Sequence, residues 1–152
     1  MRVYYLPLFA GVVLVGNAFS PWVMLGEVGF GGVPSLSAIW ILVLGLVTIL
    51  LAVLSLITRK NSRHPLLLVG FLALGIQFLS YQWLERSVSE QAWATAEAAA
   101  IVEGYDAVRP VPTRLGTGIY LGFVASIVIV GFGLTIVFNQ PTVSYIPPDD
   151  DV

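Results

Sequence analysis

The sequence predicts an all-α integral membrane protein with four transmembrane helices and an extracytoplasmic helical extension after the third. Three observations point to this class. The 152 residues are 57% apolar and only 11% charged, against about 25% charged residues in an ordinary soluble domain. The mean hydropathy of +0.90 leaves too little polar surface to cover a water-soluble fold. Long stretches without any formal charge alternate with polar connectors, which is the pattern of a multi-pass membrane protein.

Four uncharged stretches place the predicted spans at about 4–25, 36–58, 65–84 and 116–138, within one membrane domain that covers residues 1–152. A helix needs about 20 mainly apolar residues to cross the hydrocarbon core. Helix is expected because each backbone polar group in lipid must be paired within the chain. Ala18-Phe19-Ser20 offers a signal-peptide cleavage site, but Pro21 would follow the cut. The first stretch is therefore expected to remain as a transmembrane anchor.

The connectors predict the orientation of the chain in the membrane. Residues 59–64 carry three basic residues, whereas residues 27–35 carry none. Because basic residues accumulate in short cytoplasmic loops, residues 59–64 and both termini are expected in the cytoplasm, with 139–152 as a cytoplasmic tail. A preference for arginine over lysine, with frequent alanine and glycine, favours a bacterial cytoplasmic (inner) membrane.

The first outer loop, residues 26–35, contains four glycines and a proline. Such a composition favours turns and cannot sustain a helix. Trp22 and Trp40 flank this loop, and tryptophan is enriched at the headgroup level of membranes. Both side chains are therefore expected to anchor the chain at the membrane surface, with a protein contact as the alternative for each.

The second outer segment contains a predicted helix at about 87–103. No glycine or proline occurs from residue 76 to residue 103, and 91–102 is rich in alanine, the best helix former. This helix either continues the third span or starts anew at Ser87, where Ser87-Val88-Ser89-Glu90 has the form of a capping box. Gly104 suits its end. Pro110 and Pro112 predict an extended segment over 109–114.

The outer helix and the tail are the candidate docking elements. Val88, Trp93, Ala96 and Ala100 approximate one stripe, and Glu97 lies on its polar flank. This stripe is expected to pack on the chain's own outer loop or on another subunit, with Trp93 and Glu97 as docking residues. The tail is a short, acidic, proline-containing arm, and it is expected to dock on a neighbouring protein through Tyr145, Asp149, Asp150 and Asp151.

No predicted span contains Asp, Glu, Lys or Arg. Charged groups inside the membrane usually mark ion paths or proton relays, whereas uncharged polar groups usually bond across helices. Gly118-Ile119-Tyr120-Leu121-Gly122 has the G-x-x-x-G spacing that lets helices approach closely, and residues 16–20 repeat it. The residues expected to pack the helices together are Gly16, Asn17, Ser20, Gln77, Gly118, Gly122 and Ser126, and Asn17 and Gln77 are expected to face protein.

The sequence contains little that could perform chemistry. His64 is the one histidine, and it is either solvated or an axial ligand of a haem or chlorophyll. The absence of cysteine excludes disulfides and thiol nucleophiles. A net charge of −2 with seven Lys and Arg excludes a basic face for nucleic acid. We expect no enzyme activity and no cofactor of its own, although lipid is expected to bind and a partner's pigment or haem could contact the chain.

These observations favour a non-catalytic accessory or structural subunit of a larger membrane complex, with other membrane subunits and the bilayer as partners. One alternative is a small transporter or channel component. Four-helix multidrug transporters match in outline, but they carry an acidic residue in the first span, and here the nearest is Glu27, just outside it. A second alternative is a free-standing four-span protein with claudin-like topology, which would lack the loop cysteines of claudins.

Overall fold

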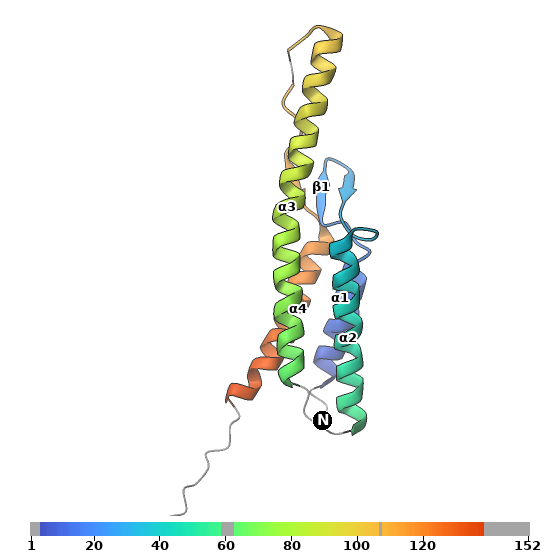
Figure 1. The fold of residues 1–152 in the computed structure, drawn as a ribbon, viewed down its shortest axis with the longest axis vertical. Coiled ribbons are helices and arrows are strands. Elements are labelled where there is room, and N and C mark those ends of the chain that lie inside the picture. Colours follow the sequence, from blue (N-terminus) through green and yellow to red (C-terminus); the bar gives the residue numbers. More distant parts are fainter. Residues whose placement is uncertain (1–3, 59–62, 107, 139–152) are drawn as a thin grey trace, which may run out of the picture.

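The computed structural model describes residues 4–58, 63–106 and 108–138, and within them it is mostly helical. The described residues form four helices, α1 (Tyr5–Asn17), α2 (Leu36–Thr58), α3 (Arg63–Glu103) and α4 (Thr117–Phe138). Three of these, α2, α3 and α4, are long and apolar enough to cross a membrane. Figure 1 shows the helices side by side in a bundle, with α3 extending well beyond the others. The fold is that of a membrane-embedded helical protein.

The expectation of an all-α chain is wrong at one end of the bundle. Three strands, β1 (Val23–Leu25), β2 (Val28–Phe30) and β3 (Thr113–Leu115), form a small antiparallel sheet in the order β2-β1-β3. Val23 pairs with Phe30 on one side and with Leu115 on the other. Gly26, with a φ of +60°, makes the tight turn between β1 and β2. The sequence predicted turns and an extended segment, but not that the two would pair.

The first helix is shorter than predicted and ends at Asn17 instead of near residue 25. Ala18, Phe19 and Ser20 form a tighter turn in which each backbone N–H bonds to the carbonyl three residues earlier. Pro21 then removes a backbone donor, so the helix cannot continue through it. The apolar residues that follow pair in β1 instead of extending the helix. At 13 residues, α1 is shorter than the about 20 residues that cross a membrane unaided.

The third helix resolves the alternative that the sequence left open. α3 runs without a break through Ser87 for 41 residues, which corresponds to about 60 Å at 1.5 Å per residue. It ends at Glu103, where Gly104 adopts a φ of +74° and donates a hydrogen bond to the carbonyl of Ala100. The chain then returns along the helix toward β3 (Figure 1).

Glycines bring pairs of helices close together in the bundle. A Cβ on Gly133 of α4 would lie 2.7 Å from Cα of Leu67 in α3, so these backbones touch directly. A Cβ on Gly11 of α1 would lie 3.2 Å from the carbonyl oxygen of Gly45 in α2. α1 also packs against α4, and α2 against α3. The bundle is therefore closed by close backbone contacts, as expected where lipid gives little hydrophobic drive for association.

Candidate functional site

A buried polar cluster joins three helices inside the bundle. Asn17 at the end of α1, Gln77 in α3 and Ser126 in α4 are all fully buried. Gln77 Nε2 donates a hydrogen bond to Ser126 Oγ at 3.2 Å. Gly122 of α4 lies against Asn17 and Gln77, because a Cβ at this position would overlap Asn17 Nδ2 and Gln77 Oε1. The cluster thus brings together four of the residues that the sequence singled out for helix packing.

The cluster is only partly satisfied by the protein itself. Asn17 Nδ2 and Oδ1 and Gln77 Oε1 are buried without a hydrogen-bond partner. Because Asn17 Nδ2 and Gln77 Oε1 both adjoin Gly122, a small side-chain rotation or one bridging water would pair them. Leaving such an atom unpaired costs about 1–3 kcal/mol. All these groups are neutral, and the arrangement can fix the relative positions of α1, α3 and α4.

The other small residues that the sequence predicted to pack helices together, Gly16, Ser20 and Gly118, differ in whether they contact another part of the chain. Gly118 contacts the turn after α1: its N–H donates to the Pro21 carbonyl at 3.0 Å, and a Cβ would come within 2.9 Å of Ser20 Cβ. Ser20 is half-buried, and its hydroxyl donates to the Gly16 carbonyl at 3.3 Å. Gly16 itself is exposed, with open space where a Cβ would stand. The spacing in α1 therefore does not mark a helix contact, and the close contacts of Gly11, Gly45 and Gly133 had no motif that could reveal them.

Trp22 is buried within the protein, so the expectation that its side chain anchors the chain among lipid headgroups is wrong. It is 1% exposed and its Nε1 donates to the backbone carbonyl of Asn17 at 3.2 Å. The indole thereby covers the end of α1, which a turn and a proline leave open. Trp40, on α2, is 54% exposed, and its placement agrees with contact to lipid.

The outer half of α3 packs partly on the chain's own loop. Val88 and Ala100 of the predicted stripe are buried, and the returning segment, residues 108–112, lies along this side of the helix (Figure 1). A hollow of about 450 Å³ remains between α3, the β1–β2 hairpin and Pro110. Its floor includes Ala92, Ala96 and Ala99. Val88 and Ala100 of the predicted stripe are therefore covered, whereas the alanines that line the hollow are covered only in part.

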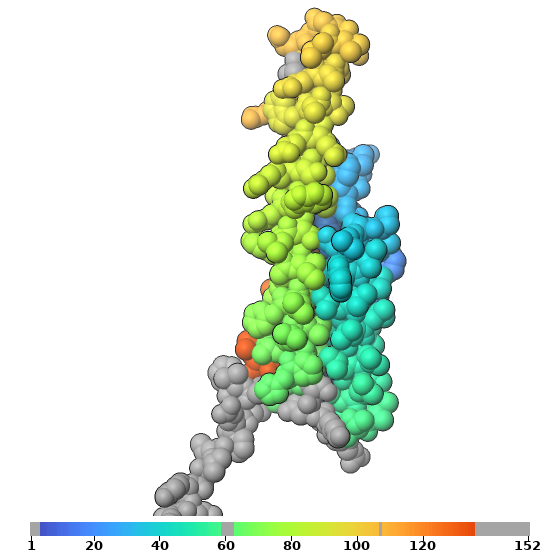
Figure 2. Space-filling model, viewed as in Figure 1, coloured from blue at the N-terminus to red at the C-terminus, as the bar shows by residue number. Residues whose placement is uncertain are grey.

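A second row on the outer half of α3 is only partly covered, since Trp93 lines a hollow together with residues 109–113 of the returning segment. Trp93, Glu97 and Ile101 are spaced four residues apart, which places them on one face of a helix. Trp93 is 39% exposed and Ile101 is 83% exposed, and Glu97 is exposed as well. We call these three residues the outer row. Figure 2 shows this half of α3 as a narrow column that rises beyond the wider bundle.

The remaining candidates lie apart from these features. His64 is exposed near the start of α3, and Glu27 is exposed in the β1–β2 turn. In the described part of the chain, no three His, Cys, Asp or Glu side chains come close enough to hold a metal ion. The proposed docking residues Tyr145, Asp149, Asp150 and Asp151 lie outside the described residues.

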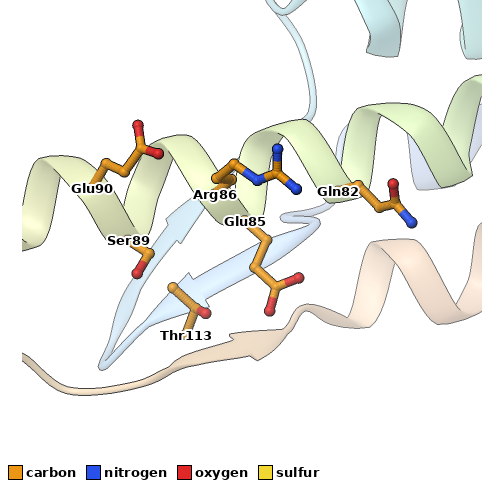
Figure 3. Close-up of a pocket in the computed structure, with 6 residues that line it drawn as sticks. All are labelled: Gln82, Glu85, Arg86, Ser89, Glu90 and Thr113. Atoms are coloured by element: carbon orange, nitrogen blue, oxygen red, sulfur yellow. The ribbon is translucent and has the colours of Figure 1, made fainter.

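Sequence reasoning missed one acidic residue at the end of the apolar part of α3. Glu85 is half-buried and lies near Tyr81. It lines a hollow between α3 and β3 together with Arg86 and Thr113 (Figure 3). The signal was present in the sequence, because Glu85 is the first charged residue after the uncharged stretch 65–84. Only the fold, however, shows that β3 closes one side of the hollow beside Glu85.

The fold and its polar cluster define a class, a membrane-embedded, mostly helical protein with a long helix that reaches past its bundle. Comparison with protein-family models, with curated proteins and with solved structures found no match. The function is therefore argued from the geometry of this chain.

Proposed function

We propose that this protein is a non-catalytic accessory or structural subunit of a larger membrane protein complex. It would act by packing its helices against neighbouring subunits and by docking the outer half of α3. The observation that carries the proposal is the outer row, in which an exposed tryptophan and an isoleucine that is 83% exposed lie beyond the apolar part of the helix. Large apolar side chains gathered in this way mark interaction sites.

The proposed membrane placement uses four spans. α2, α4 and the first half of α3 are long enough to cross, and α1 with its flanking residues would be the fourth. Residues 85–103 of α3 would then project about 28 Å from the membrane at 1.5 Å per residue. The basic connector 59–64 favours both termini in the cytoplasm, and the composition favours a bacterial inner membrane.

The chemistry of the outer row supports docking on a protein. Trp93 supplies a large apolar surface, and tryptophan is enriched at the energetic centres of interfaces. Ile101 adds a second apolar contact two turns away, and Glu97 between them would pair with a basic or hydrogen-bonding group of the partner. A neighbouring subunit that meets this row would bury two large side chains while keeping the carboxylate hydrogen-bonded. The acidic tail, through Tyr145 and Asp149 to Asp151, is proposed as a second contact on the opposite side of the membrane.

Purification in a mild detergent tests the proposal. The tagged chain is expressed in its native host, and the proteins that elute with it are quantified against it. We expect one or more membrane proteins in a fixed stoichiometric ratio to the chain. Elution of the chain alone at every detergent concentration, or companions in variable trace amounts, would contradict the proposal.

A further inference from the structure

A hollow with charges of both signs lies where the apolar part of α3 ends. It measures about 480 Å³, within the range of about 300–1,000 Å³ that small-molecule sites occupy. The residues that line it are Gln82, Glu85, Arg86, Ser89, Glu90 and Thr113. One guanidinium, two carboxylates and two hydroxyls therefore surround one small volume.

The side chains that line this hollow come from two elements, α3 and β3, and Glu90 points to the side of α3 opposite Thr113 (Figure 3). In Figure 3, Glu85 and Ser89 point from α3 toward Thr113 of β3, and the Arg86 side chain runs along the helix toward Gln82. Glu85 is half-buried and lies near Tyr81. Arg86 is exposed and free to reach a ligand at the mouth of the hollow.

The position of the hollow relates it to the membrane surface. Residues 65–84 of α3 carry no charge, and Glu85 and Arg86 follow directly. Trp83, two residues before Glu85, is 73% exposed, as is usual for tryptophan at the headgroup level. Exposed Phe78 and Leu79 continue the apolar surface on the membrane side. A lipid lying on this surface would bring its headgroup to Glu85 and Arg86.

We propose that this hollow binds the headgroup of a zwitterionic phospholipid, with the phosphate at Arg86 and the ammonium at Glu85. Arginine binds phosphate through paired charge-assisted hydrogen bonds. A purely anionic headgroup would meet the carboxylates of Glu85 and Glu90, and a purely cationic ligand would meet Arg86. A headgroup with both charges satisfies both. The proposal depends on the membrane placement of α3 and does not require a protein partner.

The lining further favours an ethanolamine headgroup over choline. A primary ammonium has three N–H donors, which can bond to the Glu85 carboxylate and to the hydroxyls of Ser89 and Thr113. A quaternary ammonium has no N–H to donate, and the hollow shows no cage of aromatic rings that would hold it instead. Phosphatidylethanolamine is therefore the expected occupant.

Native mass spectrometry tests the site. The protein is taken from micelles that contain equal amounts of phosphatidylethanolamine, phosphatidylcholine and phosphatidylglycerol, all with the same acyl chains. The wild type should retain phosphatidylethanolamine over phosphatidylglycerol by about tenfold, the effect of one charge-assisted contact. Arg86→Gln should lose most of the bound phosphatidylethanolamine and also weaken retention of the other two lipids, because all three headgroups carry the phosphate. Glu85→Gln should shift the preference toward phosphatidylglycerol, because the repulsion of its headgroup is reduced.

Arg114→Gln is the matched control. Arg114 is also exposed, and it is the neighbour of Thr113 in β3, where successive side chains point to opposite faces of the sheet. It should retain phosphatidylethanolamine as the wild type does, and all three variants should melt at the wild-type temperature in lipid-free detergent. Equal retention of the three lipids by the wild type, or an equal loss in Arg114→Gln and Arg86→Gln, would overturn the proposal. Displacement of the lipid by soluble phosphoethanolamine at equal concentration would also overturn it, since the ligand would then be a free zwitterion.

Discussion

The bundle and the outer half of α3 use similar residue types for opposite purposes. In the bundle, glycine, alanine and single polar residues are buried against other helices, as at Gly133 and Gln77. In the outer half, alanine again lines one side of the helix, but the large side chains Trp93 and Ile101 are 39% and 83% exposed. The small and polar residues of the bundle are thus buried between helices, whereas the outer half exposes Ile101 and part of Trp93. We expect substitutions in the bundle to change stability and substitutions in the outer row to change association.

The largest expected effect is that of Trp22→Ala. Trp22 is buried over the end of α1 and bonded to the Asn17 carbonyl, so its removal leaves a cavity and an unpaired carbonyl. The free energy of unfolding should fall by about 3–5 kcal/mol, measured by denaturation with SDS in mixed micelles. Trp40→Ala removes the same side chain from an exposed position and should cost about 1 kcal/mol or less. Equal losses in the two variants would show that Trp22 does not close the bundle.

Two glycines of α4 form a matched pair for the second-largest expected change in the free energy of unfolding. Gly133→Ala places a Cβ against the Leu67 backbone, whereas Gly131→Ala meets no atom within 4 Å. Both gain helix propensity, worth about 0.8–1 kcal/mol. Gly131→Ala should therefore stabilise the protein by up to about 1 kcal/mol, whereas Gly133→Ala should destabilise it by about 1–3 kcal/mol because α3 and α4 are forced apart. The same SDS titration measures both, and a stabilised Gly133→Ala would mean that α3 and α4 do not touch there.

A smaller effect is expected from the buried polar cluster. Gln77 and Ser126 share one hydrogen bond, and such bonds between membrane helices contribute about 0.6 kcal/mol on average. A double-mutant cycle with Gln77→Leu and Ser126→Ala should give a coupling energy of about that size. Gln77→Leu with Asn17→Ala should also show coupling, because both amides adjoin Gly122. A coupling energy of zero in both cycles would mean that the cluster does not connect the helices.

Much of the fold follows from local patterns that the sequence displays. Uncharged stretches of sufficient length predicted α2, α4 and the membrane part of α3, and the absence of glycine and proline from 76 to 103 allowed one long helix, which the structure has. Gly104 ended it as expected, with a left-handed backbone conformation. These features depend on residues that are neighbours along one helix, so periodicity and propensity suffice to find them.

Two of the failures have the opposite cause, since the sheet and the hollow depend on residues far apart in the sequence, whereas α1 ends early because of the nearby Pro21. The sheet requires β1 and β3, which lie about 90 residues apart, and neither strand has enough residues to give a pattern of its own. Trp22 was expected at the membrane surface because a tryptophan beside a loop looks the same whether it faces lipid or covers a helix end. The hollow at Glu85 and Thr113 likewise needs β3 to be placed beside α3. Tertiary pairing, rather than local preference, decides such positions.

The most direct test of the central claim compares Ile101→Ser with Val102→Ser. The two side chains are adjacent on α3 and equally exposed, at 83% and 84%, but only Ile101 lies in the outer row. Neither substitution should change the free energy of unfolding of the isolated chain by more than about 0.5 kcal/mol. In purification from native membranes, Ile101→Ser should lose most of the companion protein that the wild type retains, and Val102→Ser should keep it. Full retention by Ile101→Ser, or equal loss in both variants, would contradict docking through the outer row.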